Sequence, residues 1–344
     1  MSRSVLITGG AGFIGSNFVH FWLEEYPEDR VVVLDALTYA GNLANLQTAV
    51  TNPRFRFYPG RIEDRTVVDG ICRSERITHV VNFAAESHND RSMVDPTGLI
   101  DANVTGVGIL LRASKHFDIE RFLHVSTDEV YGQIENGQFR ETDPLLPRTP
   151  YSAGKAGGEM LVRAYHIAYG IPTVVTRGSN TFGPYQYPEK LLPFFITRAL
   201  QDRPLPLYGT GTQVREWLYV TDHCRGIRSA LLNGAVGEVY NLGGGNELTN
   251  LDITKLVLQL LGKPDCLIRH VPDPRGSAHD ARYALDCTRI GSLGWRPQQA
   301  MHDALERTVR WYCDHRAWWE AIVQSEAYRS FVAGYYGPIL GDDL

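Results

Sequence analysis

Residues 8–15 read Thr-Gly-Gly-Ala-Gly-Phe-Ile-Gly, between an apolar run at Ser4 to Thr8 and a stretch of helical spacing at Phe13 to Tyr26. They satisfy both Gly-x-Gly-x-x-Gly and Gly-x-x-Gly-x-x-Gly. Glycines at such a turn let the backbone approach a pyrophosphate, whose charge the helix N-terminus favours. A plain tight turn could carry the same glycines, but a dinucleotide site requires a preceding strand and a following helix, as here. We therefore expect this loop to bind a dinucleotide.

Asp35 indicates which dinucleotide is bound. It ends a second β-branched run, Val31 to Leu34, about twenty residues after the glycine loop. A carboxylate at this place binds the ribose 2′-hydroxyl. No arginine follows Asp35 directly, so a 2′-phosphate would meet repulsion. We predict NAD rather than NADP as the cofactor.

The alternation of strand and helix continues along the chain. Near-continuous apolar strands separated by helices are typical of a parallel sheet covered on both faces, so we predict a Rossmann-type doubly wound α/β fold. Proline and glycine become frequent after about residue 180. We expect an NAD-binding domain over 1–180, to which residues about 215–245 return, and a smaller, partly interleaved substrate-binding cap over 181–344. Further predicted strands are Phe55 to Tyr58, Thr78 to Phe83, Arg121 to Ser126 and Pro172 to Thr176, and further predicted helices are Thr97 to Lys115, Ser152 to Tyr169 and Leu251 to Leu261.

Composition excludes several classes of protein. The 344 residues carry a net charge of -5, without the basic excess of a nucleic-acid binder. Five cysteines, with no Cys-x-x-Cys pair, indicate free thiols and no metal site. No apolar run reaches the roughly 18 residues of a membrane span, and no signal-peptide pattern opens the chain. We expect a cytoplasmic protein with no nucleic-acid or membrane partner.

Tyr151 and Lys155 form the first catalytic candidate. They lie four residues apart near the start of a predicted helix, so both side chains project from one face. An ammonium beside a phenol favours the phenolate, and we expect Lys155 to lower the pKa of Tyr151. Such a tyrosine removes a hydroxyl proton. The chain holds 17 tyrosines, so the spacing also arises by chance in a surface pair.

Asp128 and Glu129 form the second candidate, within Ser126-Thr127-Asp128-Glu129 at the end of a predicted strand. Ligands bind parallel sheets at the carboxyl ends of their strands. Adjacent carboxylates there could equally form a solvated turn or cap a helix. The other interpretation is an acid and a base whose pKa values are pushed apart, which is what removal of water across a carbon–carbon bond requires.

Several segments together carry a resemblance over nearly the whole chain. They are Leu37 to Leu43 (LTYAGNL), Ala84 to His88 (AAESH), Asp90 to Ser92 (DRS), Ser126 to Gly132 (STDEVYG), Tyr151 to Lys155 (YSAGK), Gly183 to Gln186 (GPYQ) with Pro188 to Lys190 (PEK), and Val214 to Trp217 (VREW). In them the sequence resembles the extended short-chain dehydrogenase/reductase family and, within it, the dTDP-glucose 4,6-dehydratases.

The resemblance implies a mechanism for these residues. Tyr151, activated by Lys155, takes the proton of the substrate's 4-hydroxyl, to which Thr127 hydrogen-bonds. A hydride passes from carbon 4 to NAD, Glu129 removes the proton on carbon 5, and Asp128 protonates the leaving 6-hydroxyl. The hydride then adds to carbon 6. The implied product of dTDP-glucose is dTDP-4-keto-6-deoxyglucose.

The resemblance also implies binding roles, position by position. The implied cofactor-binding residues are Gly9, Gly12, Phe13, Ile14, Gly15, Asp35, Ala36, Leu37, Thr38, Ile62, Ala84, Ala85, Ser87, Tyr151 and Lys155. The implied substrate-binding residues are Ser87, Thr127, Asn180, Lys190, Leu191, Pro206, Tyr208, Arg215, Asn250, His279 and Arg282. Arg215 suits a diphosphate because its donors form a fork. The chain departs from the family pattern at Arg61, Ala102, Gly178 and Thr181, and in the length of Arg275 to Asp280.

Three other functions stay open at this point. One is a dehydratase for another nucleoside diphosphate hexose, although Asp35 and Asp128 point away from the GDP-mannose enzymes, which typically use NADP and lack that second aspartate. Another is a 4-epimerase or decarboxylase of UDP-sugars, which has no use for Asp128 and Glu129. The third is a non-catalytic NAD sensor. Thr97 to Lys115 and Ser152 to Tyr169 carry more apolar positions than one sheet face needs, and the resemblance implies a homodimer through these helices, with purely intramolecular packing as the alternative.

Overall fold

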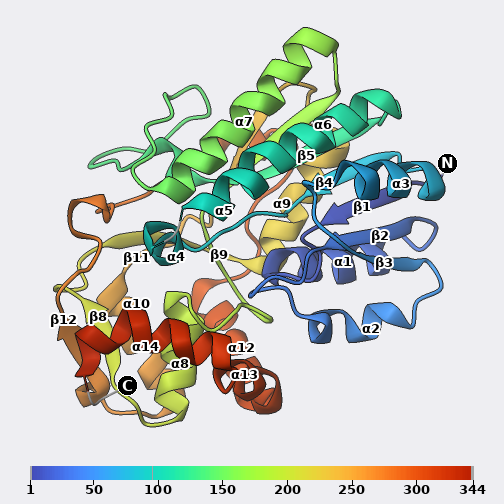
Figure 1. Ribbon diagram of the computed structural model, residues 1–344. Helices are drawn as coiled ribbons and strands as arrows, with labels where there is room; N and C mark the ends of the chain where they lie inside the picture. Colours follow the sequence, from blue (N-terminus) through green and yellow to red (C-terminus); the bar gives the residue numbers. More distant parts are fainter. Residues whose placement is uncertain (1, 95, 342–344) are drawn as a thin grey trace.

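The computed structural model describes residues 2–94 and 96–341, and its largest element is a parallel sheet of seven strands (Figure 1). The strand order is β10-β6-β5-β4-β1-β2-β3. This is the Rossmann order with one further strand, so the predicted fold class is confirmed. The strands are β1 (Ser4–Thr8), β2 (Arg30–Asp35), β3 (Phe55–Pro59), β4 (His79–Asn82), β5 (Arg121–Thr127), β6 (Thr173–Gly178) and β10 (Val239–Leu242).

Helices cover both faces of this sheet because alternate strand residues point to opposite sides. Val5 and Ile7 pack toward α1 and α9, whereas Leu6 between them packs toward α3, α6 and α7. All three side chains are fully buried. Because all seven strands pair in parallel, their carboxyl ends lie at one edge of the sheet. The helices are α1 (Phe13–Glu25), α3 (Arg65–Glu75), α6 (Val107–His116), α7 (Pro150–Tyr169) and α9 (Val220–Asn233).

The predicted helix Thr97 to Lys115 is wrong as a single regular helix. It consists of α5 (Thr97–Ile100), a π-helical turn η2 (Asp101–Gly106) and α6. The wider turn places Asn103 where its side chain accepts from the backbone N–H of Glu86, at 3.0 Å, and donates to its carbonyl, at 3.1 Å. A tertiary contact therefore overrides the α-helical pattern, and such turns are frequent near functional sites.

The second half of the chain adds two small sheets and their own helices. The order of one sheet is β11-β9-β7, and β12 pairs with β8 in the other. Their apolar side chains form two further cores with the C-terminal helices. The elements are β7 (Asn180–Phe182), β8 (Leu205–Tyr208), β9 (Val214–Tyr219), β11 (Glu247–Thr249), β12 (Ile268–Val271), α8 (Leu191–Leu200), α10 (Asn250–Leu261), α12 (Met301–Asp314), α13 (Arg316–Val323) and α14 (Glu326–Leu340), and the short helices are α2 (Gln47–Val50), α4 (Asn89–Val94) and α11 (Thr288–Gly291).

Residues about 215–245, which we predicted to return to the first domain, are divided between the large sheet and one of the small sheets. Strand β10 pairs with β6, and α9 packs against β5 and β6. Strand β9, in contrast, lies in a small sheet. The boundary at residue 180 stays a prediction, and these pairings support the interleaving of the two parts.

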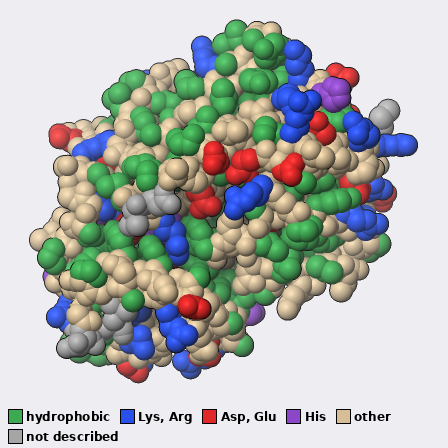
Figure 2. Space-filling view, in the orientation of Figure 1, with side chains coloured by type: hydrophobic (Ala, Val, Ile, Leu, Met, Phe, Trp, Pro, Cys, Tyr) green, Lys and Arg blue, Asp and Glu red, His purple; other side chains and the backbone are tan. Residues whose placement is uncertain are grey.

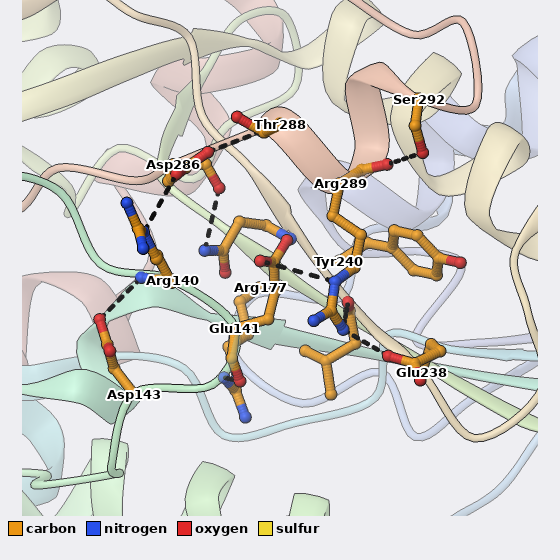
Figure 3. A network of polar contacts seen from close by, with 12 residues as sticks. Arg140, Glu141, Asp143, Arg177, Glu238, Tyr240, Asp286, Thr288, Arg289 and Ser292 are labelled. Atoms are coloured by element: carbon orange, nitrogen blue, oxygen red, sulfur yellow. Dashed lines mark hydrogen bonds and ion pairs between the residues drawn. The ribbon is translucent and has the colours of Figure 1, made fainter.

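A polar network ties a late segment to the edge of the large sheet (Figure 3). Arg289 of α11 pairs with Glu238, which precedes β10, and lies 3.8 Å from Glu141. Arg140 lies 3.5 Å from Asp286. Chain regions about 150 residues apart in sequence are joined here, so the C-terminal part contributes to the edge of the Rossmann sheet.

On the face drawn in Figure 2, the described residues form no large patch of one charge. Lys and Arg side chains lie scattered there among acidic and apolar ones. No helix among residues 2–94 and 96–341 is long and apolar enough to cross a membrane. The same residues hold no group of three or more His, Cys, Asp or Glu placed to bind a metal.

Candidate active site

One cavity of about 420 Å³ runs along the carboxyl edge of the large sheet and extends to β8, β9 and α10. This volume falls in the range of small-molecule sites. The cavity brings together nearly all predicted site residues, from both halves of the chain. Those that line it are Gly9, Gly12, Phe13, Ile14, Gly15, Asp35, Ala36, Thr38, Ile62, Ala84, Ala85, Ser87, Thr127, Asp128, Glu129, Tyr151, Lys155, Asn180, Lys190, Leu191, Pro206, Tyr208, Arg215, Asn250 and His279.

The glycine loop between β1 and α1 fits a pyrophosphate. Gly9 has a φ of +67°, which favours glycine, and a Cβ there would lie 2.7 Å from the backbone nitrogen of Ala84. A Cβ on Gly15 would lie 2.2 Å from the carbonyl oxygen of Gly9. Side chains are thus excluded where α1 begins and its free N–H groups face the cavity. The residues present fit the predicted dinucleotide.

Asp35 organises this loop as well as facing the cavity. Its carboxylate accepts hydrogen bonds from the backbone N–H groups of Ala11 and Leu37, both at 2.8 Å. Burial raises the pKa of Asp35, and the two amides oppose that rise. Each carboxylate oxygen keeps a further lone pair. A ribose hydroxyl can therefore bind without displacing either amide, in agreement with the predicted preference for NAD.

Tyr151 and Lys155 are placed by the first turns of α7. Thr149 caps this helix in a reciprocal capping box with Ser152, and proline at position 150 suits its first turn. Both predicted side chains are buried and line the cavity. The Lys155 ammonium donates to the carbonyl of Val125 at 2.7 Å. The predicted grouping on one helix face is confirmed.

The predicted direction of the Tyr151 pKa is wrong for the protein alone. Burial raises the pKa of Tyr151, the charge of Glu129 adds to that rise, and a hydrogen bond with Thr127 opposes it. The ammonium of Lys155 is directed to the Val125 carbonyl instead, and burial lowers the pKa of Lys155 to about 8. The phenol therefore keeps its proton until more positive charge comes beside it.

Asp128 and Glu129 are adjacent but have different surroundings. Thr127 ends β5 and caps the short helix η3 (Asp128–Tyr131), where its hydroxyl accepts from the N–H of Glu129 at 3.3 Å. Asp128 is buried, and its Oδ2 has no hydrogen-bond partner among the described residues. Glu129 is half-buried at the cavity. Burial raises the pKa of Asp128 well above its ordinary value, and the charge of Glu129 adds to the effect. Asp128 is the group suited to carry a proton.

The far end of the cavity offers positive charge and unpaired polar atoms. Arg215 is buried and donates to the carbonyls of Val214 and Asp280, at 2.8 and 2.9 Å. It forms no ion pair within residues 2–94 and 96–341, so its charge is available to an anion. Two buried amide oxygens of residues that line the same cavity, Asn180 Oδ1 and Asn250 Oδ1, lack partners among the described residues.

Two predicted binding residues lie away from the cavity lining. Leu37 donates its N–H to Asp35 and packs its side chain on the first core. Arg282 makes a two-pronged ion pair with Glu247 at the surface. Their binding roles stay predictions, and each has another function in the fold that the sequence did not indicate.

Sequence reasoning missed residues that the fold brings to the cavity from elsewhere. Asn89 donates to the Glu129 carboxylate at 2.7 Å, and half-buried Arg275 pairs with Asp90 at 2.6 Å. Both Asn89 and Asp90 begin α4. The signal for Asn89 was its place between His88 and Asp90, which end and begin two of the quoted motif segments. No local pattern indicates the pairing with residue 275.

One departure from the family pattern has a steric explanation. Gly178 ends β6 beside the ring of His223, and a Cβ on it would lie 2.6 Å from that ring. The Nδ1 atom of His223 lies 2.8 Å from the hydroxyl of Thr181, another departing position. Gly178 and Thr181 thus accommodate one buried histidine together, and any larger residue at 178 would displace it.

Comparison with known proteins agrees with this site. Residues 6–308 match the family described as GDP-mannose 4,6 dehydratase. The chain belongs to this family. Its relatives include the dTDP-glucose 4,6-dehydratase of Actinoplanes sp., 47% identical with 92% of this chain and 99% of that protein covered. They also include the low-salt glycan biosynthesis protein Agl12 of Haloferax volcanii, 50% identical over 90% and 98%.

Solved structures place the chain in the same part of the family. The dTDP-glucose 4,6-dehydratase DesIV of Streptomyces venezuelae, with NAD and dTDP bound, superposes with a TM-score of 0.90 at 47% identity, covering 93% of this chain and all of that one. A UDP-glucose 4-epimerase from Thermotoga maritima reaches 0.84 at 29% identity, over 91% and 99%. The likeness is greater to a dehydratase than to this epimerase.

Proposed function

We propose that this protein is a dTDP-glucose 4,6-dehydratase, an NAD-dependent lyase of deoxysugar biosynthesis. The observation that carries the proposal is the acid–base pair of buried Asp128 and half-buried Glu129, which shares one cavity with Tyr151 and Lys155. Oxidation of a hydroxyl needs only the latter two residues. Elimination of water needs a proton donor and a proton acceptor as well, and the pair supplies both.

The glycine loop and Asp35 would hold NAD, with Ala84, Ala85 and Ser87 along the nicotinamide side. When bound, NAD supplies a positively charged hydride acceptor for substrate carbon 4 and later returns the hydride to carbon 6. Burial raises the pKa of Tyr151, and the positive charges of bound NAD and of Lys155 would together oppose that rise. Tyr151 then takes the proton of the 4-hydroxyl, while the Thr127 hydroxyl forms a hydrogen bond with the same oxygen.

The ketone formed at carbon 4 acidifies the hydrogen on carbon 5. Glu129 removes that hydrogen as a proton, and the electron pair of the broken C–H bond forms a double bond between carbons 5 and 6. The bond between carbon 6 and its oxygen breaks, and Asp128 gives the departing hydroxide its proton, so that water leaves. The raised pKa of Asp128 keeps that proton available near neutral pH. A proton returns to carbon 5 at the end.

Substrate specificity is proposed to reside at the far end of the cavity. Arg215 and Lys190 supply positive charge for the diphosphate, and Asn180 and Asn250 supply amide groups. Lys190 already donates to the carbonyl of Ser87 at 2.6 Å, which anchors it at the cavity wall. Pro206 and Tyr208 of β8 would contact the base. A dehydratase for another nucleoside diphosphate hexose would use the same chemistry, and this end of the cavity is where it would differ.

The test is incubation of purified protein with dTDP-glucose and no added NAD, followed by the alkali-induced absorbance of a 4-keto-6-deoxy sugar. UDP- and GDP-sugars are run in parallel. Rapid product from dTDP-glucose is expected. Product from another nucleotide alone would keep the mechanism and change the substrate. If none of them gave a keto sugar, even with NAD supplied, the result would favour UDP-sugar 4-epimerisation instead, since that reaction needs no acid–base pair.

A homodimer is proposed through α5, α6 and α7, which lie along one face (Figure 1). Several apolar side chains of these helices are 48–68% exposed, which is typical of a surface covered by a partner. They are Ile100, Met160 and Ile167. Sedimentation of the protein tests the proposal.

A cytoplasmic location is also proposed, on the composition alone, and cell fractionation tests it.

A further inference from the structure

Asn89 lies between the proposed proton acceptor and the helix that carries Tyr151. It begins α4, which packs against α7. Its amide nitrogen donates to Oε2 of Glu129 at 2.7 Å, and its amide oxygen accepts from the Thr149 hydroxyl at 2.9 Å. One side chain thus connects the end of β5 to the first turn of α7.

The chemistry of the two neighbours fixes the orientation of this amide. A carboxylate accepts hydrogen bonds and cannot donate them, so the NH₂ group must face Glu129. The Thr149 hydroxyl accepts from the N–H of Ser152 at 3.1 Å as the cap of α7, which leaves its proton for the amide oxygen. Both ends of Asn89 are therefore satisfied in one orientation, and the reversed amide would lose both bonds.

Glu129 depends on this contact for its position. Among the residues that the structure describes, Asn89 is the one side chain that hydrogen-bonds to the Glu129 carboxylate. The carboxylate is half-buried beside the cavity, and the alternative to a fixed position is rotation toward open solvent in the cavity. Hydrogen bonds to a charged group are stronger than neutral ones and hold it in place. Asn89 leaves the second carboxylate oxygen, Oε1, free to face a substrate.

We propose that Asn89 is a positioning residue that holds Glu129, in its ionised form, for removal of the proton on carbon 5. The inference rests on the proposed function. It assigns Asn89 to one step only, because among the described residues its amide hydrogen-bonds neither Tyr151 nor Lys155, and the cap bond between Thr149 and Ser152 does not involve it. Loss of the amide therefore slows elimination and spares the earlier oxidation at carbon 4.

The experiment compares Asn89→Leu with the unaltered protein and with Met93→Leu. Leucine is similar in size to asparagine but has neither the amide nitrogen nor the amide oxygen. Met93 is 46% exposed on the same helix and serves as the matched control for disturbance of α4. We expect kcat for dTDP-glucose to fall about 10–100-fold in Asn89→Leu, with KM within about two-fold. Met93→Leu should keep both constants.

Rapid mixing of each protein with substrate separates the two steps. Near-ultraviolet absorbance of the reduced nicotinamide rises to a higher level in Asn89→Leu than in the unaltered protein, because oxidation continues while elimination is slow. Asn89→Asp is nearly isosteric and keeps an oxygen for Thr149, so it serves if the leucine variant fails to fold. It places a second negative charge against Glu129 and should show the same accumulation.

Two outcomes would overturn the positioning role. One is a kcat within about two-fold of the unaltered protein in both variants. The other is a fall in kcat without accumulation of the reduced cofactor, which indicates general damage to the site. An unaltered protein that makes no keto sugar from any sugar nucleotide would instead refute the proposed function itself, and the same assay identifies that case separately.

Discussion

The catalytic end and the nucleotide end of the cavity are built in different ways. At the catalytic end, Thr127, Asp128 and Glu129 follow one strand, and Tyr151 and Lys155 occupy one helix turn. At the nucleotide end, the candidate residues come from separate elements, including β8, β9, α10 and the segment 272–282. The proposed catalytic groups are placed within each set by local structure, whereas the proposed nucleotide-binding groups meet only through tertiary packing. We expect substitutions at the first end to change turnover and those at the second to change affinity.

The largest effect is expected at the catalytic end, from Glu129→Gln. The change is isosteric and removes the proton acceptor, so kcat should fall about 10²–10⁴-fold while KM changes little. Steady-state assay of keto-sugar formation measures it, with exposed Glu135→Gln as the matched control. If Glu129→Gln kept the turnover of the unaltered protein, Glu129 would not be the proton acceptor, and the expected difference between the two ends of the cavity would not hold.

At the nucleotide end, Arg215→Met should raise KM for dTDP-glucose about 10–100-fold and leave kcat within a few-fold. The reason is loss of a buried cation from a site with no carboxylate paired to it. The same assay over a range of substrate concentrations separates the two constants. A fall in kcat at unchanged KM would mean that Arg215 belongs to the catalytic end.

Lys155→Met is expected to change the free energy of unfolding as well as the activity. Burial lowers the pKa of Lys155 from 10.5 to about 8. The folded protein therefore binds this proton less tightly than the unfolded chain, which costs stability below about pH 8, and the cost disappears as pH rises toward about 10.5. The variant should lose activity yet unfold with a free energy higher by on the order of 1–3 kcal/mol at about pH 7.

Urea unfolding at several pH values measures this difference, which should shrink between about pH 8 and about pH 10.5. Exposed Lys255→Met is the control and should show no such change. A difference that grows with pH would contradict the sign of the Lys155 shift.

The smallest effect is expected from Arg282→Ala. Its guanidinium is bound to Glu247 outside the cavity lining, and surface ion pairs contribute little. KM should stay within about two-fold of the unaltered protein. A rise as large as that of Arg215→Met would restore the substrate-binding role that the sequence predicted.

Local sequence predicts what local structure decides. The glycine loop, Asp35 at the end of β2 and the acid–base pair after β5 follow from strand ends and helix starts, and the structure brings them together as expected. The large sheet follows in the same way, because apolar runs of strand length alternate with helices.

Long-range contacts decide the rest. The π-helical turn around Asn103 exists because its side chain bonds Glu86, and the pairing of Arg275 with Asp90 joins segments far apart in sequence. The pKa of Tyr151 is raised because burial outweighs the effect expected from its spacing to Lys155. None of these follows from a pattern within one element.

The most direct test of dehydration with resident NAD uses dTDP-glucose that carries deuterium at carbon 4. The product is examined by mass spectrometry and by NMR of carbon 6. We predict a 4-keto-6-deoxy sugar with the deuterium on carbon 6, without added NAD. A sugar nucleotide that keeps its 6-hydroxyl, or a keto sugar whose deuterium has passed to solvent, would contradict the proposed reaction.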